Sequence, residues 1–337
     1  MRSVRHTPGV LKSVAALALA LLLATACGRG GDTTSPASPA PSEPPAASPS
    51  LSSAPAASPT AVPLARGAST RTFRYGGLDR SYRLYLPSAA SLPGASLPLV
   101  VALHGGLGTP DQFAATSRLE TLAESEGFIA VFPAGIERTW NGGACCRPAS
   151  ALRVDDTGFL AALVQDLQAS LPIDAKRVLV TGHSNGAIMA FRLACERPDL
   201  VDAVVPVAGS LEIDRCQPSV PVPLLDIHGD ADRNHPLAGG QGDRSVANVD
   251  FRSTSDTMAM WTAAIGCAAT PISATTGPLT TTSWSGCRGG VRTELVVIAG
   301  ADHPWPGSLG RSAAGGEPSQ ALDASRAAYQ FLLDVTK

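Results

Sequence analysis

The sequence of 337 residues is poor in charged and aromatic side chains, which make up 16% and 5% of it. Its formal net charge of −2 argues against nucleic acid or an acidic polymer as a partner. The glycine patterns that cradle nucleotide phosphates, G-x-G-x-x-G and the P-loop, are absent, and no internal repeat is present. No cysteines have the C-x-x-C spacing of zinc sites, so we expect neither a metal nor another cofactor.

The longest apolar run lies near the N-terminus. Basic residues precede it, and Val14–Ala24 is unbroken but too short for a comfortable membrane span. Small residues then lead directly to Cys27, which resembles the bacterial lipobox, in which this cysteine is lipidated after cleavage. We therefore expect residues 1–26 to be a lipoprotein signal peptide and Cys27 to carry the anchor. Plain secretion, with cleavage after Ala26, is the alternative.

Residues 27–68 are dominated by proline, alanine, serine and threonine and carry almost no charge. Such a segment cannot bury enough apolar surface to offset the entropy of ordering it, so we expect a disordered tether. Residues 69–337 have the right size for one large α/β domain.

Cysteine use agrees with export, because the six cysteines after Cys27 are an even number and predict disulfides. Cys267 and Cys287 flank a loop rich in threonine and serine, and we expect them to pair. The other four could pair in three ways, one of which joins chain neighbours; buried free thiols are the alternative. These four are Cys145, Cys146, Cys195 and Cys216.

Strand-like and helix-like runs alternate along residues 69–337. The first two strand-like runs alternate polar and apolar residues, as at an antiparallel edge, whereas the later ones are continuously apolar, like buried parallel strands. The pattern predicts a doubly wound, mostly parallel sheet with helices on both faces, whose ligands bind beyond the carboxyl ends of the strands. The expected strands are Thr72–Tyr75, Tyr82–Leu86, Leu97–Leu103, Phe128–Phe132, Arg177–Thr181, Ala203–Ala208, Pro223–His228 and Glu294–Ala299. The expected helices are Asp111–Glu126, Thr157–Ser170, Asn185–Glu196, Asp256–Ile265 and Pro318–Val335.

One strand-to-helix junction reads Gly182-His183-Ser184-Asn185-Gly186, a G-x-S-x-G motif. Between a strand and a helix this motif is the nucleophile elbow of α/β-hydrolases. The turn strains the serine and admits only small residues two places before and after it. The Ser184 hydroxyl would then lie at a helix N-terminus, where free N–H groups favour negative charge. A helix-capping serine after a glycine turn is the alternative. The two interpretations differ in whether an acid and a histidine follow the serine in the right order.

A catalytic triad on this fold requires the order serine, acid, histidine. Asp230 and Asp232 both follow a late strand, and the residues alone barely separate them, whereas Asp226 lies within the strand and is less well placed. Only His235 and His303 follow Asp232. His235 shares the loop of the acid and is too close to reach over it, so we expect His303 to be the base.

The strand Leu97–Leu103 runs into a glycine-rich turn. In this fold such a turn supplies one oxyanion-hole N–H, and the residue after the nucleophile supplies the other. We expect the amides of Gly106, or of Leu107, and of Asn185 to form the hole; an ordinary loop is the alternative. Loss of one such donor typically raises the barrier by about 2.7–4 kcal/mol.

Six motifs then follow one another in a recognisable order. They are His104-Gly105-Gly106, Trp140-Asn141-Gly142-Gly143-Ala144-Cys145-Cys146, Val154-Asp155-Asp156-Thr157-Gly158-Phe159, Gly182 to Gly186, His228-Gly229-Asp230-Ala231-Asp232 and His303-Pro304-Trp305-Pro306-Gly307. Together they resemble the polyhydroxybutyrate-depolymerase-like esterase family, which includes feruloyl and acetylxylan esterases. The match runs from about Phe73 to the C-terminal helix. The resemblance implies an α/β-hydrolase fold with Ser184 as nucleophile, His303 as base and Asp232 rather than Asp230 as acid. The family's glycine before the histidine is Asp302 here and its threonine after it is Pro304, which puts substrate preference in doubt.

Two tryptophans, Trp140 and Trp305, fall in loops beside the expected cavity. Such an indole can stack on a sugar or phenolic ring or wall an acyl pocket, and packing beneath a loop is the alternative. We interpret His183 as structural, and Asp155 or Asp156 as a helix N-cap rather than a catalytic group.

The sequence thus predicts a secreted serine carboxylesterase, lipid-anchored to the outer face of the cell membrane. It hydrolyses an ester of a plant polysaccharide or polyester oligomer through an acyl-enzyme; feruloyl, acetyl and hydroxybutyryl groups all stay open. It has no nucleic acid partner and touches the membrane only through its lipid. A serine peptidase on the same fold and a non-catalytic polysaccharide-binding lipoprotein are the alternatives.

Overall fold

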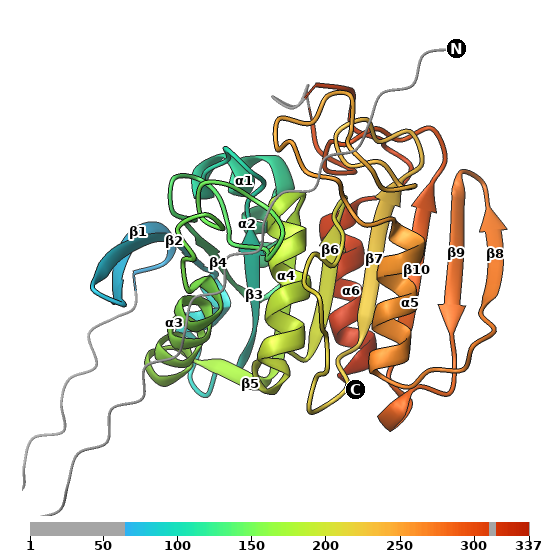
Figure 1. Ribbon diagram of the computed structural model, residues 1–337. Coiled ribbons are helices and arrows are strands. Elements are labelled where there is room, and N and C mark those ends of the chain that lie inside the picture. The colour runs from blue at the N-terminus through green and yellow to red at the C-terminus, as the bar shows by residue number, and fades with distance from the viewer. Residues whose placement is uncertain (1–64, 310–314, 337) are drawn as a thin grey trace, which may run out of the picture. The chain divides into compact units, whose positions relative to one another are not determined.

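The computed structural model describes residues 65–309 and 315–336, so the expected signal peptide, Cys27 and nearly all of the tether lie outside the described residues. A ten-stranded sheet runs through the described part in the order β1-β2-β4-β3-β5-β6-β7-β10-β9-β8 (Figure 1). The strands are β1 Gly67–Tyr75, β2 Leu78–Leu86, β3 Leu97–Leu103, β4 Ile129–Pro133, β5 Ile173–His183, β6 Ala203–Val207, β7 Leu224–Gly229, β8 Ile272–Thr276, β9 Leu279–Trp284 and β10 Thr293–Ile298. The α-helices are α1 Pro110–Ser117, α2 Leu119–Glu126, α3 Asp156–Ser170, α4 Asn185–Glu196, α5 Thr254–Ala264 and α6 Ala324–Val335. Short 3₁₀ turns occupy Ser88–Ser91, Pro198–Leu200 and Arg288–Gly290.

The centre of the sheet is parallel, from β4 through β3, β5, β6 and β7 to β10, and both edges are antiparallel. Alternate residues of β3 enter two separate cores, because successive side chains of a strand point to opposite faces. Leu99 and Val101 pack on the face of α3, α4 and α5, whereas Val100 and Ala102 pack on the face of α1, α2 and α6. Figure 1 shows α4 and α5 in front of the sheet and α6 behind it. The prediction of a doubly wound α/β-hydrolase sheet is confirmed.

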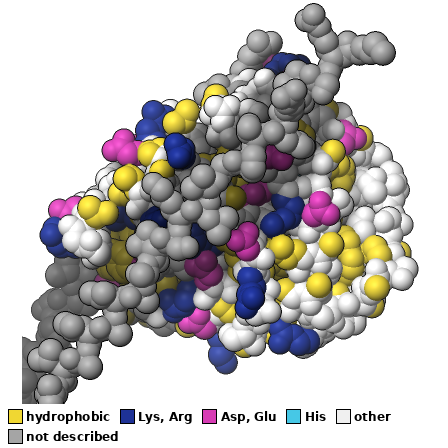
Figure 2. Space-filling view, in the orientation of Figure 1, with side chains coloured by type: hydrophobic (Ala, Val, Ile, Leu, Met, Phe, Trp, Pro, Cys, Tyr) yellow, Lys and Arg dark blue, Asp and Glu magenta, His cyan; other side chains and the backbone are white. Residues whose placement is uncertain are grey.

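The surface carries both signs of charge. Figure 2 shows basic and acidic side chains interspersed on one face rather than gathered by sign. In the described part of the chain, no helix combines the length and the apolar character needed to cross a membrane.

Two helices differ from the sequence-based expectation. The helix expected over 111–126 is divided into α1 and α2, because Arg118 adopts a left-handed conformation with φ of 57° between them. The C-terminal helix begins at Ala324 rather than near Pro318. The Asp323 side chain caps it there by accepting the N–H of Arg326.

The loop expected between Cys267 and Cys287 is a β-hairpin instead, formed by β8 and β9. Threonine is β-branched and favours strands, so its abundance here signalled a strand rather than a loop. Hydroxyl pairs link the two strands, with Ser273 at 2.8 Å from Thr282 and Thr275 at 3.1 Å from Thr280.

All six cysteines of the described residues are paired. The predicted Cys267–Cys287 bridge is confirmed and brackets the hairpin. Of the pairings left open, the structure contains Cys145–Cys146 and Cys195–Cys216. Three disulfides fit a protein exported to an oxidising environment.

The start of α3 is tied to the loop after β4. Asp155 caps the helix by accepting the N–H of Gly158 at 2.9 Å, so its N-cap assignment is confirmed. Asp156 is buried and pairs with Arg80 on β2 at 2.7 Å, while its other oxygen accepts the N–H of Asn141 at 2.8 Å. This pair fixes the loop that borders the candidate site.

Candidate active site

Ser184 occupies the sharp turn between β5 and α4. Its backbone has φ of 55° and ψ of −120°, which is strained for any residue except glycine. A Cβ atom on Gly182 would overlap the carbonyl oxygen of Gly186, and one on Gly186 would overlap that of Leu103. The close approach of three backbones therefore requires glycine at both positions, and the Ser184 hydroxyl stands at the N-terminus of α4.

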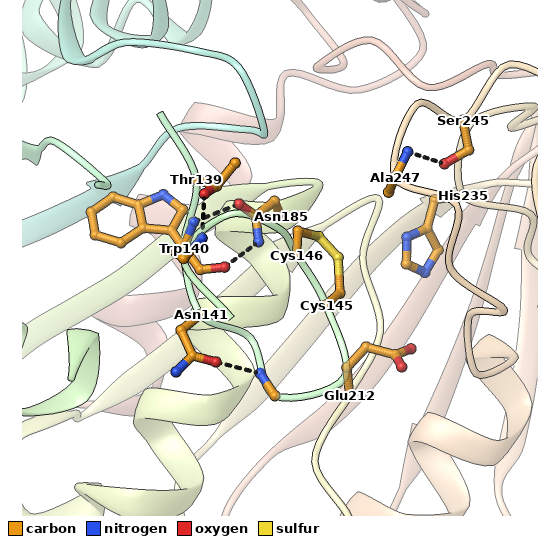
Figure 3. Close-up of a disulfide and its surroundings, with 12 residues drawn as sticks. Thr139, Trp140, Asn141, Cys145, Cys146, Asn185, Glu212, His235, Ser245 and Ala247 are labelled. Carbon is orange, nitrogen blue, oxygen red and sulfur yellow. Dashed lines mark hydrogen bonds between the residues drawn. A yellow bond between two sulfur atoms is a disulfide. The ribbon is translucent and has the colours of Figure 1, made fainter. Parts of the chain in front are cut away.

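Gly106 and Asn185, the residues expected to supply the oxyanion-hole N–H groups, line the same cavity as Ser184. The N–H of Leu107 donates to the carbonyl oxygen of Arg138 at 2.8 Å, so it is engaged, and Gly106 is left as the donor from the glycine-rich turn. The Asn185 side chain brackets the Trp140 backbone, accepting its N–H at 2.7 Å and donating to its carbonyl at 3.0 Å (Figure 3). The Asn185 N–H itself begins α4 and needs no intrahelical partner, so an incoming oxyanion can use it.

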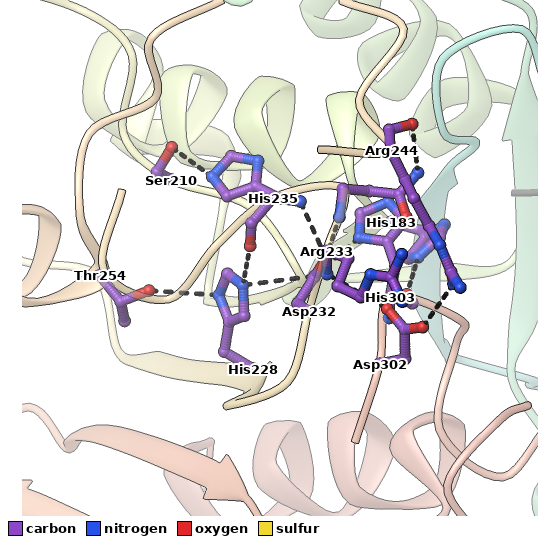
Figure 4. A network of polar contacts seen from close by, with 11 residues as sticks. His183, Ser210, His228, Asp232, Arg233, His235, Arg244, Thr254, Asp302 and His303 are labelled. Atoms are coloured by element: carbon purple, nitrogen blue, oxygen red, sulfur yellow. Dashed lines mark hydrogen bonds and ion pairs between the residues drawn. The ribbon is translucent and has the colours of Figure 1, made fainter. Parts of the chain in front are cut away.

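His303 and Asp232 come from the loops after β10 and β7, which are parallel neighbours in the sheet. Nδ1 of His303 lies 2.7 Å from Oδ2 of Asp232 (Figure 4). The other oxygen of Asp232 accepts the N–H groups of Asn234 and His235, each at 2.8 Å. Burial raises the pKa of Asp232, but hydrogen bonds with His228 and His303 outweigh it and hold that pKa far below its usual range. The aspartate is therefore a fixed carboxylate that orients the imidazole.

Ser184 and His303 both border two adjoining cavities. The smaller cavity has a volume of about 170 Å³ and also includes Asn185 and Ile188. The larger one has a volume of about 840 Å³ and extends over the glycine-rich turn toward Trp305. The structure thus places the serine and the histidine that the sequence singled out at the same two cavities, with the aspartate hydrogen-bonded to the histidine.

Both tryptophans are buried, and Trp305 borders the larger cavity. Trp140 has no exposed surface, and its indole N–H donates to the carbonyl oxygen of His104 at 2.9 Å. Trp305 is 1% exposed, donates to the Ser325 hydroxyl at 3.1 Å and packs edge-on against Phe113. Trp140 therefore packs beneath a loop, as the alternative has it, whereas a contact of Trp305 with substrate stays a prediction, because this residue walls the larger cavity.

His183, next to Ser184, supports the loop that carries His303. Nε2 of His183 lies 2.8 Å from the carbonyl oxygen of His303. Burial, aided by the charge of His303, lowers the pKa of His183 to about 3, so the ring is neutral and its N–H donates. Asp230 is likewise structural, since it accepts the N–H of Gly300 at 2.6 Å and joins the two loops.

Residues 80–265 match the family model described as Esterase PHB depolymerase. The chain belongs to this esterase family. Over 346 residues it is 32% identical to "Putative esterase NocK" from Nocardia uniformis subsp. tsuyamanensis, covering 94% of this chain and 97% of the relative. It is 27% identical over 161 residues to the bifunctional acetylxylan esterase/xylanase XynS20E from Neocallimastix patriciarum, covering 47% of this chain and 22% of the relative.

The esterase also resembles a solved structure, the acetyl xylan esterase from Aspergillus awamori. The TM-score is 0.51 at 17% identity, covering 70% of this chain and 94% of the other, a likeness that shows the fold alone. The family and the relatives, rather than this likeness, show carboxylic ester hydrolysis.

The sequence did not predict one wall of the smaller cavity of the esterase. It contains His235 and Phe251, whose rings stack with centroids 4.0 Å apart, and the disulfide residue Cys146. His235 is buried and hydrogen-bonds the Ser210 hydroxyl at 2.8 Å, so it belongs to the site without acting as its base. Only the paired cysteines could have signalled this wall, because the loop carrying Phe251 has no motif.

Asp226, the acid considered less well placed, lies outside the triad. It is fully buried on β7, and within the described residues neither carboxylate oxygen has a hydrogen-bond partner. Burial raises its pKa to about 7 from the ordinary value of 3.8, although the charge of His228 opposes that change.

We expect Asp226→Asn to remove part of the pH dependence of stability. Since the folded state holds the Asp226 proton more tightly, the free energy of unfolding should fall as pH rises from about 4 to about 7, by up to about 4 kcal/mol. Urea unfolding at several pH values should show a flatter profile for this variant. Asp214→Asn removes one exposed carboxylate and is the control; parallel profiles for wild type and Asp226→Asn would contradict the interpretation.

Proposed function

We propose that this esterase is a serine carboxylesterase that works through an acyl-enzyme. Ser184 attacks the ester carbonyl while His303 takes its proton as general base, and Asp232 holds the ring and stabilises the imidazolium. His303 then protonates the departing alcohol, and the same histidine activates the water that releases the acid. The observation that carries this proposal is the 2.7 Å contact between His303 and Asp232 at cavities that Ser184 borders.

The oxyanion is assigned to the amides of Gly106 and Asn185. Gly106 lies close to the elbow, because a Cβ atom added to it would come 3.6 Å from the Cβ of Asn185. Two fixed N–H groups would stabilise the charge that develops on the carbonyl oxygen without rearranging during the reaction.

Replacement of Ser184 by alanine should reduce turnover of p-nitrophenyl acetate by at least about 10³-fold, since nucleophile and base act as a unit. His303→Ala should have a similar effect, and Asp232→Asn should lower kcat by about 10⁴-fold through the wrong imidazole tautomer. A fluorophosphonate should label the wild type at Ser184 and leave Ser184→Ala unlabelled.

Asp230→Asn is the matched control, because it removes a neighbouring carboxylate that does not contact the imidazole. Unchanged turnover in Ser184→Ala would refute the serine mechanism. Faster cleavage of peptide amides than of esters would favour a peptidase. Sugar binding without phosphonate labelling would favour a binding lipoprotein.

We assign the acyl part of the substrate to the smaller cavity and the alcohol part to the larger one. The Asn185 amide borders only the smaller cavity, and a polymeric alcohol needs the more open space. A volume of about 170 Å³ is comparable to the ~150 Å³ of an engineered cavity that holds benzene. Such a space favours acetyl or hydroxybutyryl groups over the longer feruloyl group.

A hydrolysis panel tests this assignment. Acetylated xylan and hydroxybutyrate oligomers should be cleaved with a kcat/KM at least about tenfold above that for methyl ferulate, which is the ratio that 1.4 kcal/mol of lost binding gives. Chromatographic measurement of the released acids distinguishes the three. A preference for methyl ferulate would show that the smaller cavity does not hold the acyl group.

We also propose that the protein is exported as a lipoprotein with Cys27 as its anchor and residues 27–68 as a tether. The three disulfides support export, and the sequence before Cys27 supports lipidation. Radioactive palmitate should label the wild type in bacterial cells but not Cys27→Ser, which should appear in the medium. A labelled Cys27→Ser variant would exclude this anchor.

A further inference from the structure

The charged side chains around the two cavities are all basic. Arg147 borders the smaller cavity, Arg138 and Arg244 border the larger one, and no aspartate or glutamate is among the described residues that line either. The whole chain has 28 acidic and 26 Lys and Arg residues, so composition does not account for this local excess of positive charge.

Two of the three guanidinium groups already have partners. Arg138 donates to the carbonyl oxygens of Leu107 and Gly108 and so holds the glycine-rich turn. Arg244 pairs with Asp302 at 2.9 Å and links the loop before α5 to the loop of the catalytic histidine. These two arginines position loops and have fewer donors left for a substrate.

Arg147 differs from them. It is exposed, and it forms no hydrogen bond or ion pair with any other described residue. The backbone beneath it is nevertheless well held, because the N–H of Cys146 donates to Trp140 and the N–H of Ser150 donates to Cys146. A guanidinium without a partner among the described residues is thus mounted on an ordered loop at the cavity that Ser184 borders.

The rest of that cavity is largely apolar, with Ile188, Ala247 and Phe251 among its residues. A ligand that suits this environment has a short apolar stem and an anionic end. Arginine carries five N–H donors in a planar fork that matches a carboxylate in bidentate geometry. No acidic side chain competes for it there.

We propose that the smaller cavity selects short acyl groups with a carboxylate at the far end, which Arg147 binds. Among esters of the short acyl groups that fit this cavity, the preferred substrates are then half-esters of dicarboxylic acids such as succinate or glutarate. This inference rests on the serine esterase function proposed above. The reaction consumes one water, breaks the acyl C–O bond and releases the alcohol, the dicarboxylate and a proton.

The test compares half-esters with neutral esters of the same shape, using the purified full-length enzyme. Monoethyl succinate is paired with ethyl levulinate, and monoethyl glutarate with ethyl 5-oxohexanoate, so that a methyl ketone replaces the carboxylate. The readout is the ratio of kcat/KM for the charged and the neutral ester in each pair. Arg147→Gln should lower this ratio about tenfold, at the weak end for a charged hydrogen bond because the site is exposed.

Arg147→Lys should give an intermediate ratio, since lysine keeps the charge but lacks the fork. Added salt should lower the ratio in the wild type and leave it nearly constant in Arg147→Gln. The control is Arg153→Gln, which removes the same charge from the same loop at an exposed residue outside both cavities; its ratio should equal that of the wild type.

Equal ratios in wild type and Arg147→Gln would overturn the proposal, as would an equal loss in Arg153→Gln. Failure of the underlying function looks different, because Ser184→Ala would then cleave both members of a pair as fast as the wild type. If the enzyme is an active serine esterase but the ratio of kcat/KM for charged and neutral esters is unchanged in Arg147→Gln, only the carboxylate subsite is refuted.

Discussion

The contact between the backbones of β5 and α4 determines most of what surrounds it. At Gly182 and Gly186 the chain passes so near to itself that no side-chain carbon fits, and Ser184 is held in a strained conformation between them. Strain of this kind persists only when the surrounding structure over-determines it. Here β3 on one side and β6 on the other supply that restraint through parallel pairing.

The loops that carry Ser184, Asp232 and His303 meet because parallel strands end at one edge of the sheet. β7 and β10 are neighbours, so the loops that follow them can place Asp232 and His303 in hydrogen-bond contact although 71 residues separate them. His183 then fixes the far loop through the carbonyl of His303. The site is therefore specified by topology first and by side-chain packing second.

Much of this was predictable from the sequence. The G-x-S-x-G motif, the order of the acid and the histidine, and the continuous apolar strands each reflect a local constraint, and local constraints leave a trace in the sequence. Asp232 was the exception, since it was separated from Asp230 only by a family resemblance; the structure distinguishes them by their hydrogen-bond partners.

The unpredicted features depend on contacts between distant segments. The left-handed break at Arg118 and the wall formed by His235 and Phe251 have no motif, because packing of the whole domain sets them. The burial of Trp140 and Trp305 also depends on distant segments, because the exposure of a loop residue is set by the segments that fold over it. Asp302, which replaces the family's glycine with a negative charge, pairs with Arg244, which lies 58 positions earlier in the chain.

The hairpin of β8 and β9 has a consequence for the solubility of the molecule. β9 pairs along the whole of β10, the strand that leads to His303. Without β9, β10 would be the outermost strand, and its backbone amide and carbonyl groups on that side would be unpaired. An uncovered strand of that kind recruits strands from other molecules and aggregates. The hydroxyl-rich ribbon, fastened at its base by Cys267–Cys287, instead presents threonine and serine to water at that margin. β10, the strand that leads to His303, is thereby kept from the edge of the sheet, where β8 lies instead.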